Sequence, residues 1–523
     1  MDSQARYEIV LKDAITGQRI TDSLSITFTG DAALKAADGT SLNGKTITTT
    51  DGLVGLGATF SASAKDFSVL AGNRTLGWLE TGTRVVGDTS VTGDRTLELR
   101  LVNTNKAASV NASPESVAMR VATVTTTASG ALAGPVTLVT APKTVTNAEG
   151  MAETIGSASL ALKAGTTGRA ADGTVAAAGP LTVSATLFSN ASVGALLAFP
   201  GGFAASVTGA PASLLNGTTA SDVAFITGGF AQFSVTDSTG KAIRNFDQPI
   251  NVSIDLPKTS LDINGNPVLA GSEYPVWSYD DATGKWKFER MGTVSEKSPV
   301  DPNNYTVAFS TNHLSAWNLD FATPSCTAQI NLTGRPVNDE RQLAVEVSGV
   351  AGQRFGRIGY MTDSQLSIYR APVNVKVNVK VRDQGVVVGR ASNVLLCTAA
   401  NQPNPLTVPM TLLPIAVGTV IRVDTSESCA NGSQKRALPT FAWVNVNNAG
   451  NWRVGYTLPV AGAPVARKDF RTVVAGTSTA YAYNPRNSRY ESQSVTVTAN
   501  NTATAAFNFI MSNCSTGPTG GSE

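Results

Sequence analysis

The period of two in its apolar residues constrains the fold of this 523-residue chain more than any other feature. Apolar and polar side chains alternate over short segments such as 7–11, 97–101 and 373–379. Such alternation puts the apolar side chains on one face of a β-strand. Asp-Gly and Asn-Gly pairs, which favour tight turns, lie between such segments at 38–39, 51–52, 172–173 and 264–265. The pattern predicts an all-β chain of short strands packed as β-sandwiches.

The length of the chain predicts several domains, because single hydrophobic cores rarely grow beyond about 250–300 residues. We expect tandem β-sandwich domains in an elongated arrangement. The predicted boundaries are one sandwich over 1–105, a longer sandwich region over 106–322, two further sandwiches over 323–413 and 414–514, and a flexible tail over 515–523.

Composition and charge exclude several classes of function. The chain has 40 basic and 38 acidic residues and a net charge of +2, so no nucleic-acid partner is expected. No apolar run approaches the ~18 residues of a transmembrane helix. No phosphate loop, dinucleotide fingerprint or hydrolase elbow is present, and we expect neither a cofactor nor a metal. Asp262–Asn266 partly resembles a calcium-binding loop, but the position of its glycine fits a hairpin turn better.

The four cysteines indicate the compartment. Cys326, Cys397, Cys429 and Cys514 are widely spaced and lack the CxxC spacing of metal or redox sites. Of the three possible pairings we favour Cys326–Cys397 and Cys429–Cys514, because each pair brackets one β module. Four buried free thiols in a cytosolic protein are the alternative. Two structural disulfides predict an extracellular, cell-surface or periplasmic protein. The chain starts without a signal peptide, so we expect a mature or truncated secreted form.

The single histidine of the chain lies in the tripeptide His313-Leu314-Ser315, between two strand-like runs. An imidazole titrates near neutral pH and can take a proton from a nearby hydroxyl group. The nearest bond that the Ser315 oxygen can attack is the chain's own Leu314–Ser315 peptide bond. The tripeptide is therefore a candidate for self-processing. The alternative is a histidine that packs in a β turn and hydrogen-bonds the backbone.

The segments around the tripeptide support this hypothesis. An aromatic hairpin over 275–286 is followed by a strand-like run at 305–309, and Trp317 lies two positions after Ser315. This order resembles the self-cleaving β-sandwich family that includes the GAIN domains of adhesion receptors, related modules in ankyrin-like and death-domain scaffold proteins, and bacterial surface homologues. The paired cysteines that precede the motif in receptor GAIN domains are absent here.

The resemblance implies an intramolecular N-to-O acyl shift. His313 would act as the general base, and the Ser315 oxygen would attack the carbonyl group of Leu314 to give an ester that water hydrolyses. Asp320 and Asn318 are candidates for orienting the imidazole. Any enzymatic activity is expected to stop at this self-cleavage, with no external substrate.

Three other regions resemble one another, each with a strand, a turn and a second strand, at 7–30, 328–349 and 441–510. They are similar to the prealbumin-like sandwiches called carboxypeptidase regulatory-like domains, which are common spacers in bacterial surface proteins. The resemblance implies a structural role, because this fold carries no catalytic activity by itself.

Together these features predict a secreted or cell-surface structural or adhesive protein. One alternative is a subunit of an extracellular filament with strand exchange. Another is a carbohydrate-binding component of a surface complex that stacks sugars on Trp277, Tyr279 and Trp286, although core positions are favoured for these aromatic residues. The expected partners are other surface proteins, polysaccharide or copies of the chain itself.

Overall fold

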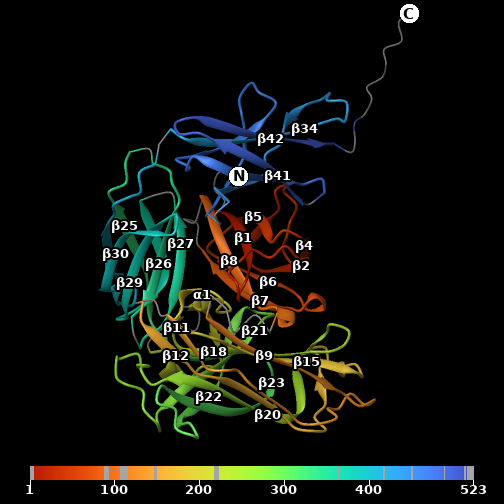
Figure 1. Ribbon diagram of the computed structural model, residues 1–523, viewed down its shortest axis with the longest axis vertical. Helices are drawn as coiled ribbons and strands as arrows, with labels where there is room; N and C mark the ends of the chain where they lie inside the picture. The colour runs from red at the N-terminus through yellow and green to blue at the C-terminus, as the bar shows by residue number, and fades with distance from the viewer. Residues whose placement is uncertain are drawn as a thin grey trace, which may run out of the picture.

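The protein is described by a computed structural model that covers residues 5–87, 93–106, 116–146, 150–216, 219, 223–337, 339–350, 352–361, 364–415, 418–448, 451–487, 489–511 and 514. Its regular structure is almost entirely β-strand. The described helices are short: α1 (Val193–Leu196), η1 (Arg74–Leu76) and η3 (Ala212–Leu214). The strands form four groups with separate sheets, here called units 1 to 4 (Figure 1). The predicted all-β class of tandem sandwiches is confirmed.

Unit 1 consists of two four-stranded sheets packed around one core. Its strands are β1 (Ala5–Asp13), β2 (Leu24–Gly30), β3 (Ala33–Lys35), β4 (Thr46–Thr49), β5 (Leu53–Thr59), β6 (Asp66–Asn73), β7 (Trp78–Val86) and β8 (Gly93–Leu101). The sheet orders are β3-β5-β1-β8 and β4-β2-β6-β7. Alternate apolar residues of both sheets, such as Ile9, Phe28 and Phe67, fill the space between them.

Unit 2 is a larger sandwich in which one long strand joins the two sheets. Its strands are β9 (Val117–Thr125), β10 (Val136–Val139), β11 (Lys143–Thr146), β12 (Ala152–Ile155), β13 (Ala158–Leu162), β14 (Gly168–Arg169), β15 (Pro180–Phe188), β16 (Ala204–Ala205), β17 (Val207–Thr208), β18 (Val223–Thr236), β19 (Ala242–Ile243), β20 (Asn245–Pro257), β21 (Glu273–Asp280), β22 (Lys285–Glu296), β23 (Asn304–His313) and β24 (Ala316–Thr323). The order along the joined sheet is β10-β13-β20-β23-β22-β21-β24-β18-β15-β9. Strand β22 pairs with β21 over most of its length and with β23 at its last residues. It is therefore the strand that passes from one sheet of the sandwich to the other.

Units 3 and 4 are smaller sandwiches. Unit 3 contains β25 (Ser325–Thr333), β26 (Leu343–Gly349), β27 (Gly356–Met361), β28 (Gln365–Pro372), β29 (Lys376–Asp383), β30 (Val386–Leu395), β31 (Cys397–Ala399), β32 (Gln402–Pro403) and β33 (Leu406–Pro409). Its larger sheet has the order β27-β26-β29-β30. Unit 4 contains β34 (Val420–Ser428), β35 (Arg436–Ala437), β36 (Phe441–Val446), β37 (Asn451–Tyr456), β38 (Leu458–Pro459), β39 (Ala466–Arg471), β40 (Gly476–Asn484), β41 (Arg489–Val497) and β42 (Thr502–Ile510).

Local predictions from the sequence can be compared with these elements. Gly39 and Gly265 adopt positive φ angles of 85° and 82° in tight turns, as their Asp-Gly and Asn-Gly contexts predict. The predicted strand over 373–379 is wrong in its first half. Asn374 has a φ of 58° and turns the chain between β28 and β29, although Val373 and Val375 on either side of it are buried.

Both predicted disulfides are present. Cys326 is bonded to Cys397 and Cys429 to Cys514, with Cα–Cα distances of 5.9 and 5.7 Å. The first disulfide joins β25 to β31 within unit 3. The second joins the end of β34 to the residues that follow β42, which lie next to each other because these two strands pair in parallel. Each disulfide therefore ties together distant parts of one unit.

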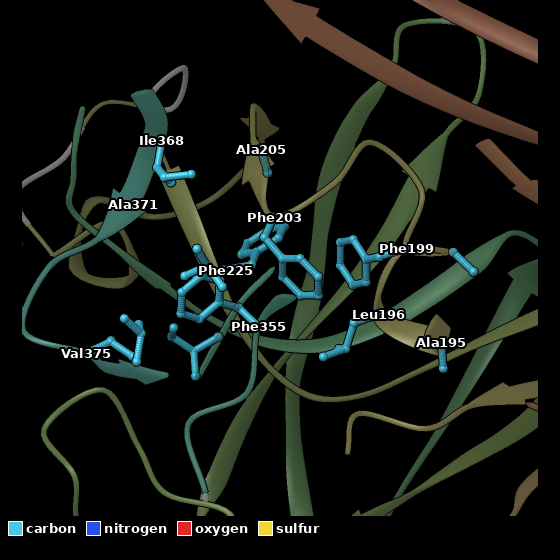
Figure 2. Packing of buried hydrophobic residues seen from close by; sticks show 14 of the residues in the cluster. Ala195, Leu196, Phe199, Phe203, Ala205, Phe225, Phe355, Ile368, Ala371 and Val375 are labelled. Carbon is cyan, nitrogen blue, oxygen red and sulfur yellow. The ribbon is translucent and has the colours of Figure 1, made fainter. Parts of the chain in front are cut away.

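The units pack on one another through buried apolar side chains. The largest cluster crosses three units and includes Leu79 of unit 1, Phe225 of unit 2 and Phe355 of unit 3. Figure 2 shows Phe203, Phe225 and Phe355 facing one another where units 2 and 3 meet. The backbone supports this contact, because the Thr227 amide donates to the carbonyl oxygen of Arg354 at 2.8 Å.

Unit 4 packs on unit 1, the most distant unit in sequence. Along the longest axis of the molecule, unit 1 lies between unit 2 and unit 4, with unit 3 alongside (Figure 1). Trp443 is fully buried against Val10 and Leu53 of unit 1. The Phe441 ring lies directly over Gly55, where an added Cβ atom would come within 2.4 Å of the ring.

We expect Gly55→Ala to destabilise the contact between units 1 and 4. The new methyl group must displace the Phe441 ring, and overpacking of this kind costs about 1–3 kcal/mol. Gly134→Ala is the matched control, because a Cβ atom at Gly134 meets nothing within 4 Å. Denaturant unfolding of both variants measures the difference. Equal stabilities for the two variants would contradict the tight contact.

Candidate functional site

The His313-Leu314-Ser315 tripeptide lies where the chain crosses unit 2 from one sheet to the other. Strand β23 ends at His313 and pairs with β20, whereas β24 begins at Ala316 and pairs with β18 and β21. Backbone hydrogen bonds hold the crossing on both sides. The Leu314 amide donates to the carbonyl oxygen of Arg244 at 2.8 Å, and the carbonyl oxygen of Ser315 accepts from the Phe233 amide at 3.2 Å.

The His313 imidazole is half-buried and has polar partners on both ring nitrogens. Nδ1 lies 3.2 Å from the Thr311 hydroxyl oxygen, and Nε2 lies 3.5 Å from Oε1 of Glu289. The ring also packs against Trp317, with 5.0 Å between ring centroids. Burial lowers the pKa of His313 from its ordinary value, the Glu289 carboxylate opposes this shift, and the Lys287 ammonium group adds to it.

The Ser315 hydroxyl is buried and is engaged by the backbone rather than by the imidazole. It donates a hydrogen bond to the carbonyl oxygen of Tyr279 on β21. Among the contacts of the described residues, His313 and Ser315 share no hydrogen bond. For the acyl shift, the Ser315 oxygen would have to leave Tyr279 and rotate toward the Leu314 carbonyl carbon, and the imidazole would have to follow.

Two ion pairs lie next to the Leu314–Ser315 bond, where unit 1 meets unit 2. Arg74 pairs with Glu80, and Arg244 pairs with Asp281 at 2.5 Å. With residues 314–316 these side chains line a space of about 20 Å³, which is roughly the volume that one water molecule needs. Burial raises the pKa of Asp281, and Arg244 opposes that shift. Unit 1 therefore covers this side of the bond.

The residues proposed to orient His313 are placed elsewhere. Asp320 and Asn318 are fully buried and bond to each other, while the Thr227 hydroxyl donates to Asn318 at 3.2 Å. Burial raises the pKa of Asp320 well above its ordinary value. The carboxylate that faces His313 belongs to Glu289 on β22. Sequence spacing carried no signal for it, because Glu289 belongs to a different strand, in the part of β22 that pairs with β21, and only folding brings its carboxylate to 3.5 Å from the His313 ring.

The aromatic hairpin belongs to the core. Trp277, Tyr279 and Trp286 are at most 3 % exposed. The indole nitrogen of Trp277 donates to the Asp320 carbonyl oxygen, and that of Trp286 to the Pro200 carbonyl oxygen. These rings are not available to stack on a polysaccharide, which confirms the favoured core positions.

The candidate calcium loop at Asp262–Asn266 is a turn. Asp262 accepts hydrogen bonds from the amides of Asn264 and Asn266, as in a turn. Within the described part of the chain, no group of three metal-ligating side chains gathers. In the same residues, no helix has the length and hydrophobicity needed to cross a membrane.

Comparison with known proteins gives only distant structural likenesses. No protein-family model and no curated protein matches the chain. Similar solved structures include GBS52, the minor pilin of Streptococcus agalactiae, at 9% identity and a TM-score of 0.16, covering 38% of this chain and 100% of that one. BcpA, the major pilin subunit of Bacillus cereus, is 8% identical over 97% of this chain and 99% of its own, with a TM-score of 0.13. At such values the likeness supports no conclusion about function.

We expect the single histidine to titrate with a midpoint below 6.5, because burial favours its neutral form. As the pH falls through 6.5 the unfolded chain takes up a proton that folded His313 resists, so this group lowers folding stability there. The NMR chemical shift of the imidazole protons, followed against pH, measures the midpoint without overlap, since the chain has no other histidine.

Two charge variants test the cause of that shift. Glu289→Gln should lower the midpoint further, and Lys287→Gln should raise it, because each removes a charge that acts on the imidazole. Glu273→Gln, at an exposed position of β21, is the control and should leave it unchanged. A wild-type midpoint above 6.5, or equal values in all variants, would contradict the described environment.

Proposed function

We propose that this protein is a secreted or cell-surface structural protein whose four β-sandwich units act as one rigid body. The observation that carries the proposal is the set of buried contacts between units. A chain of independent spacers would need only linkers, whereas here large aromatic side chains of one unit are buried by another. Such apolar interfaces oppose relative motion of the units.

The two disulfides support an oxidising location. Structural disulfides form and persist in secreted and surface proteins, and they are rare where cellular thiols are kept reduced. Both bonds lie in the C-terminal half, within units 3 and 4. They would stabilise these smaller sandwiches by restricting the unfolded chain, by about 4 kcal/mol for loops of this length.

The surroundings of the tripeptide also favour a structural role over catalysis on external substrates. The Ser315 hydroxyl is buried against a backbone carbonyl, and the space beside it has room for only about one water molecule. A substrate from solution therefore has no access to this hydroxyl in the folded arrangement. Adhesion to other surface proteins and filament formation by strand exchange stay as hypotheses for how such a body is used.

The proposal predicts that the protein recovered from its source cells is on the outer surface or in the medium, with both disulfides formed. Alkylation of the denatured protein without reductant should leave all four cysteines unmodified, and reduction first should allow four modifications. Reduced cysteines in freshly recovered protein would contradict the proposal. Sedimentation velocity at rising concentration tests the filament hypothesis, which a monomer at every concentration would remove.

Self-cleavage between Leu314 and Ser315 is a separate prediction. It would give fragments 1–314 and 315–523 on a denaturing gel of fresh protein. The fragments would separate without reductant, because neither disulfide crosses the junction. Ser315→Ala should stay intact, whereas Ser310→Ala, on the adjacent strand β23, should cleave like the wild type. A single full-length wild-type band would contradict cleavage.

A further inference from the structure

Units 1, 3 and 4 enclose a cavity of about 580 Å³ at the place where they meet. Strand β8 of unit 1 and β27 of unit 3 lie next to each other at this junction (Figure 1). The cavity is lined by both strands and by β37 and β39 of unit 4. Its volume is within the range of about 300–1,000 Å³ that is usual for small-molecule sites.

Each of the three units contributes one arginine to the cavity wall. These residues are Arg95 on β8, Arg357 on β27 and Arg453 on β37. Within the described residues, none of the three forms an ion pair with a carboxylate within 4.0 Å, although Glu340 and Asp339 lie close enough to raise the pKa of Arg453. The Nε atom of Arg95 is buried without a hydrogen-bond acceptor. The Arg453 guanidinium donates to two backbone carbonyl groups, those of Glu340 and Arg471.

Arg357 is the most exceptional of the three. Burial lowers its pKa to about 10, and the neighbouring Arg370 adds to that shift. Burial also lowers the pKa of Arg453 to about 10. Removing a cation from water without an adjacent counter-charge costs free energy. Buried arginines of this kind are therefore candidates for binding an anionic ligand.

The acidic residues of the cavity wall are already engaged by other arginines. The Asp469 carboxylate is paired with Arg422 at 2.8 Å and lies 3.6 Å from Arg471. The Glu340 carboxylate is half-exposed and lies 3.8 Å from Arg471. Neither carboxylate therefore forms an ion pair with Arg95 or Arg357. The Glu340 carboxylate does raise the pKa of Arg453, but burial outweighs it.

We propose that this cavity binds a small oxyanion-bearing sugar, a sugar carboxylate or sugar phosphate, which the arginines of three units hold together. Guanidinium groups recognise carboxylate and phosphate by paired hydrogen bonds. Gln342 and Tyr369 also line the wall, and an amide and a phenol hydroxyl group suit the hydroxyl groups of a sugar ring. This site is independent of the proposed structural function and of the tripeptide.

Calorimetric titration and thermal unfolding of the full chain test the site with four probes: glucuronate, glucose 6-phosphate, glucose and inorganic phosphate. The two charged sugars should bind and raise the unfolding temperature, less so at high salt. Glucose should not bind, and phosphate should bind more weakly than glucose 6-phosphate. The difference between the two charged sugars identifies which oxyanion is preferred.

Arg357→Gln should weaken binding of the preferred sugar at least about tenfold, because it removes a charged hydrogen-bond donor. It should not lower the unfolding temperature of the unliganded protein, since it also removes an unpaired buried charge. Arg390→Gln, at an exposed position of β30 in the same unit, is the matched control and should bind normally. Arg95→Gln repeats the test from unit 1.

The proposal is overturned if neither charged sugar binds at millimolar concentration. It is also overturned if Arg357→Gln and Arg95→Gln bind as tightly as the control. Equal binding of phosphate and glucose 6-phosphate would contradict the sugar part of the proposal. A lower unliganded stability of Arg357→Gln with unchanged affinity would assign the arginine a structural role instead.

Discussion

The apolar cluster shared by units 1, 2 and 3 is the contact on which the rest of the structure depends. Each sandwich buries the inner faces of its sheets, and Phe203 of unit 2 packs edge to face on Phe355 of unit 3, so that one apolar cluster continues from unit to unit. The hydrophobic effect is roughly proportional to the apolar area removed from water, and aromatic side chains dominate that area. Burying them together sets the positions of three units at once.

Several other features follow from that contact. Unit 1 is held on unit 2, where Arg74 donates to the hydroxyl groups of Ser234 and Thr236 at 2.5 and 2.9 Å. This places unit 1 over one side of the Leu314–Ser315 bond. Unit 4 then packs on the far side of unit 1 through Trp443. The arrangement brings together three arginines that lie far apart in the sequence, and it leaves a polar cavity between the units.

The tripeptide lies between two strands, as the sequence predicts, but the side chains around its imidazole differ from those the sequence suggested. The sequence indicated two strands around His313, and β23 and β24 lie there. What sequence spacing could not supply was the surroundings of the imidazole. Glu289 lies in the part of β22 that pairs with β21, and its carboxylate comes within 3.5 Å of the His313 ring, whereas Asp320, which is near in sequence, belongs to a separate buried network. Strand neighbours are chosen by long-range packing, which a single sequence does not reveal.

By itself the sequence determined the all-β class and the turns at Asp-Gly and Asn-Gly, and it favoured the correct one of three possible pairings of the four cysteines. These properties depend on side-chain alternation, on local backbone preferences and on cysteines that bracket single modules. Only the tertiary structure decided that unit 4 packs on unit 1, that the aromatic hairpin is buried, and that three arginines line one cavity. Those outcomes depend on which apolar surfaces cover one another, and that is a property of the assembled units rather than of any one segment.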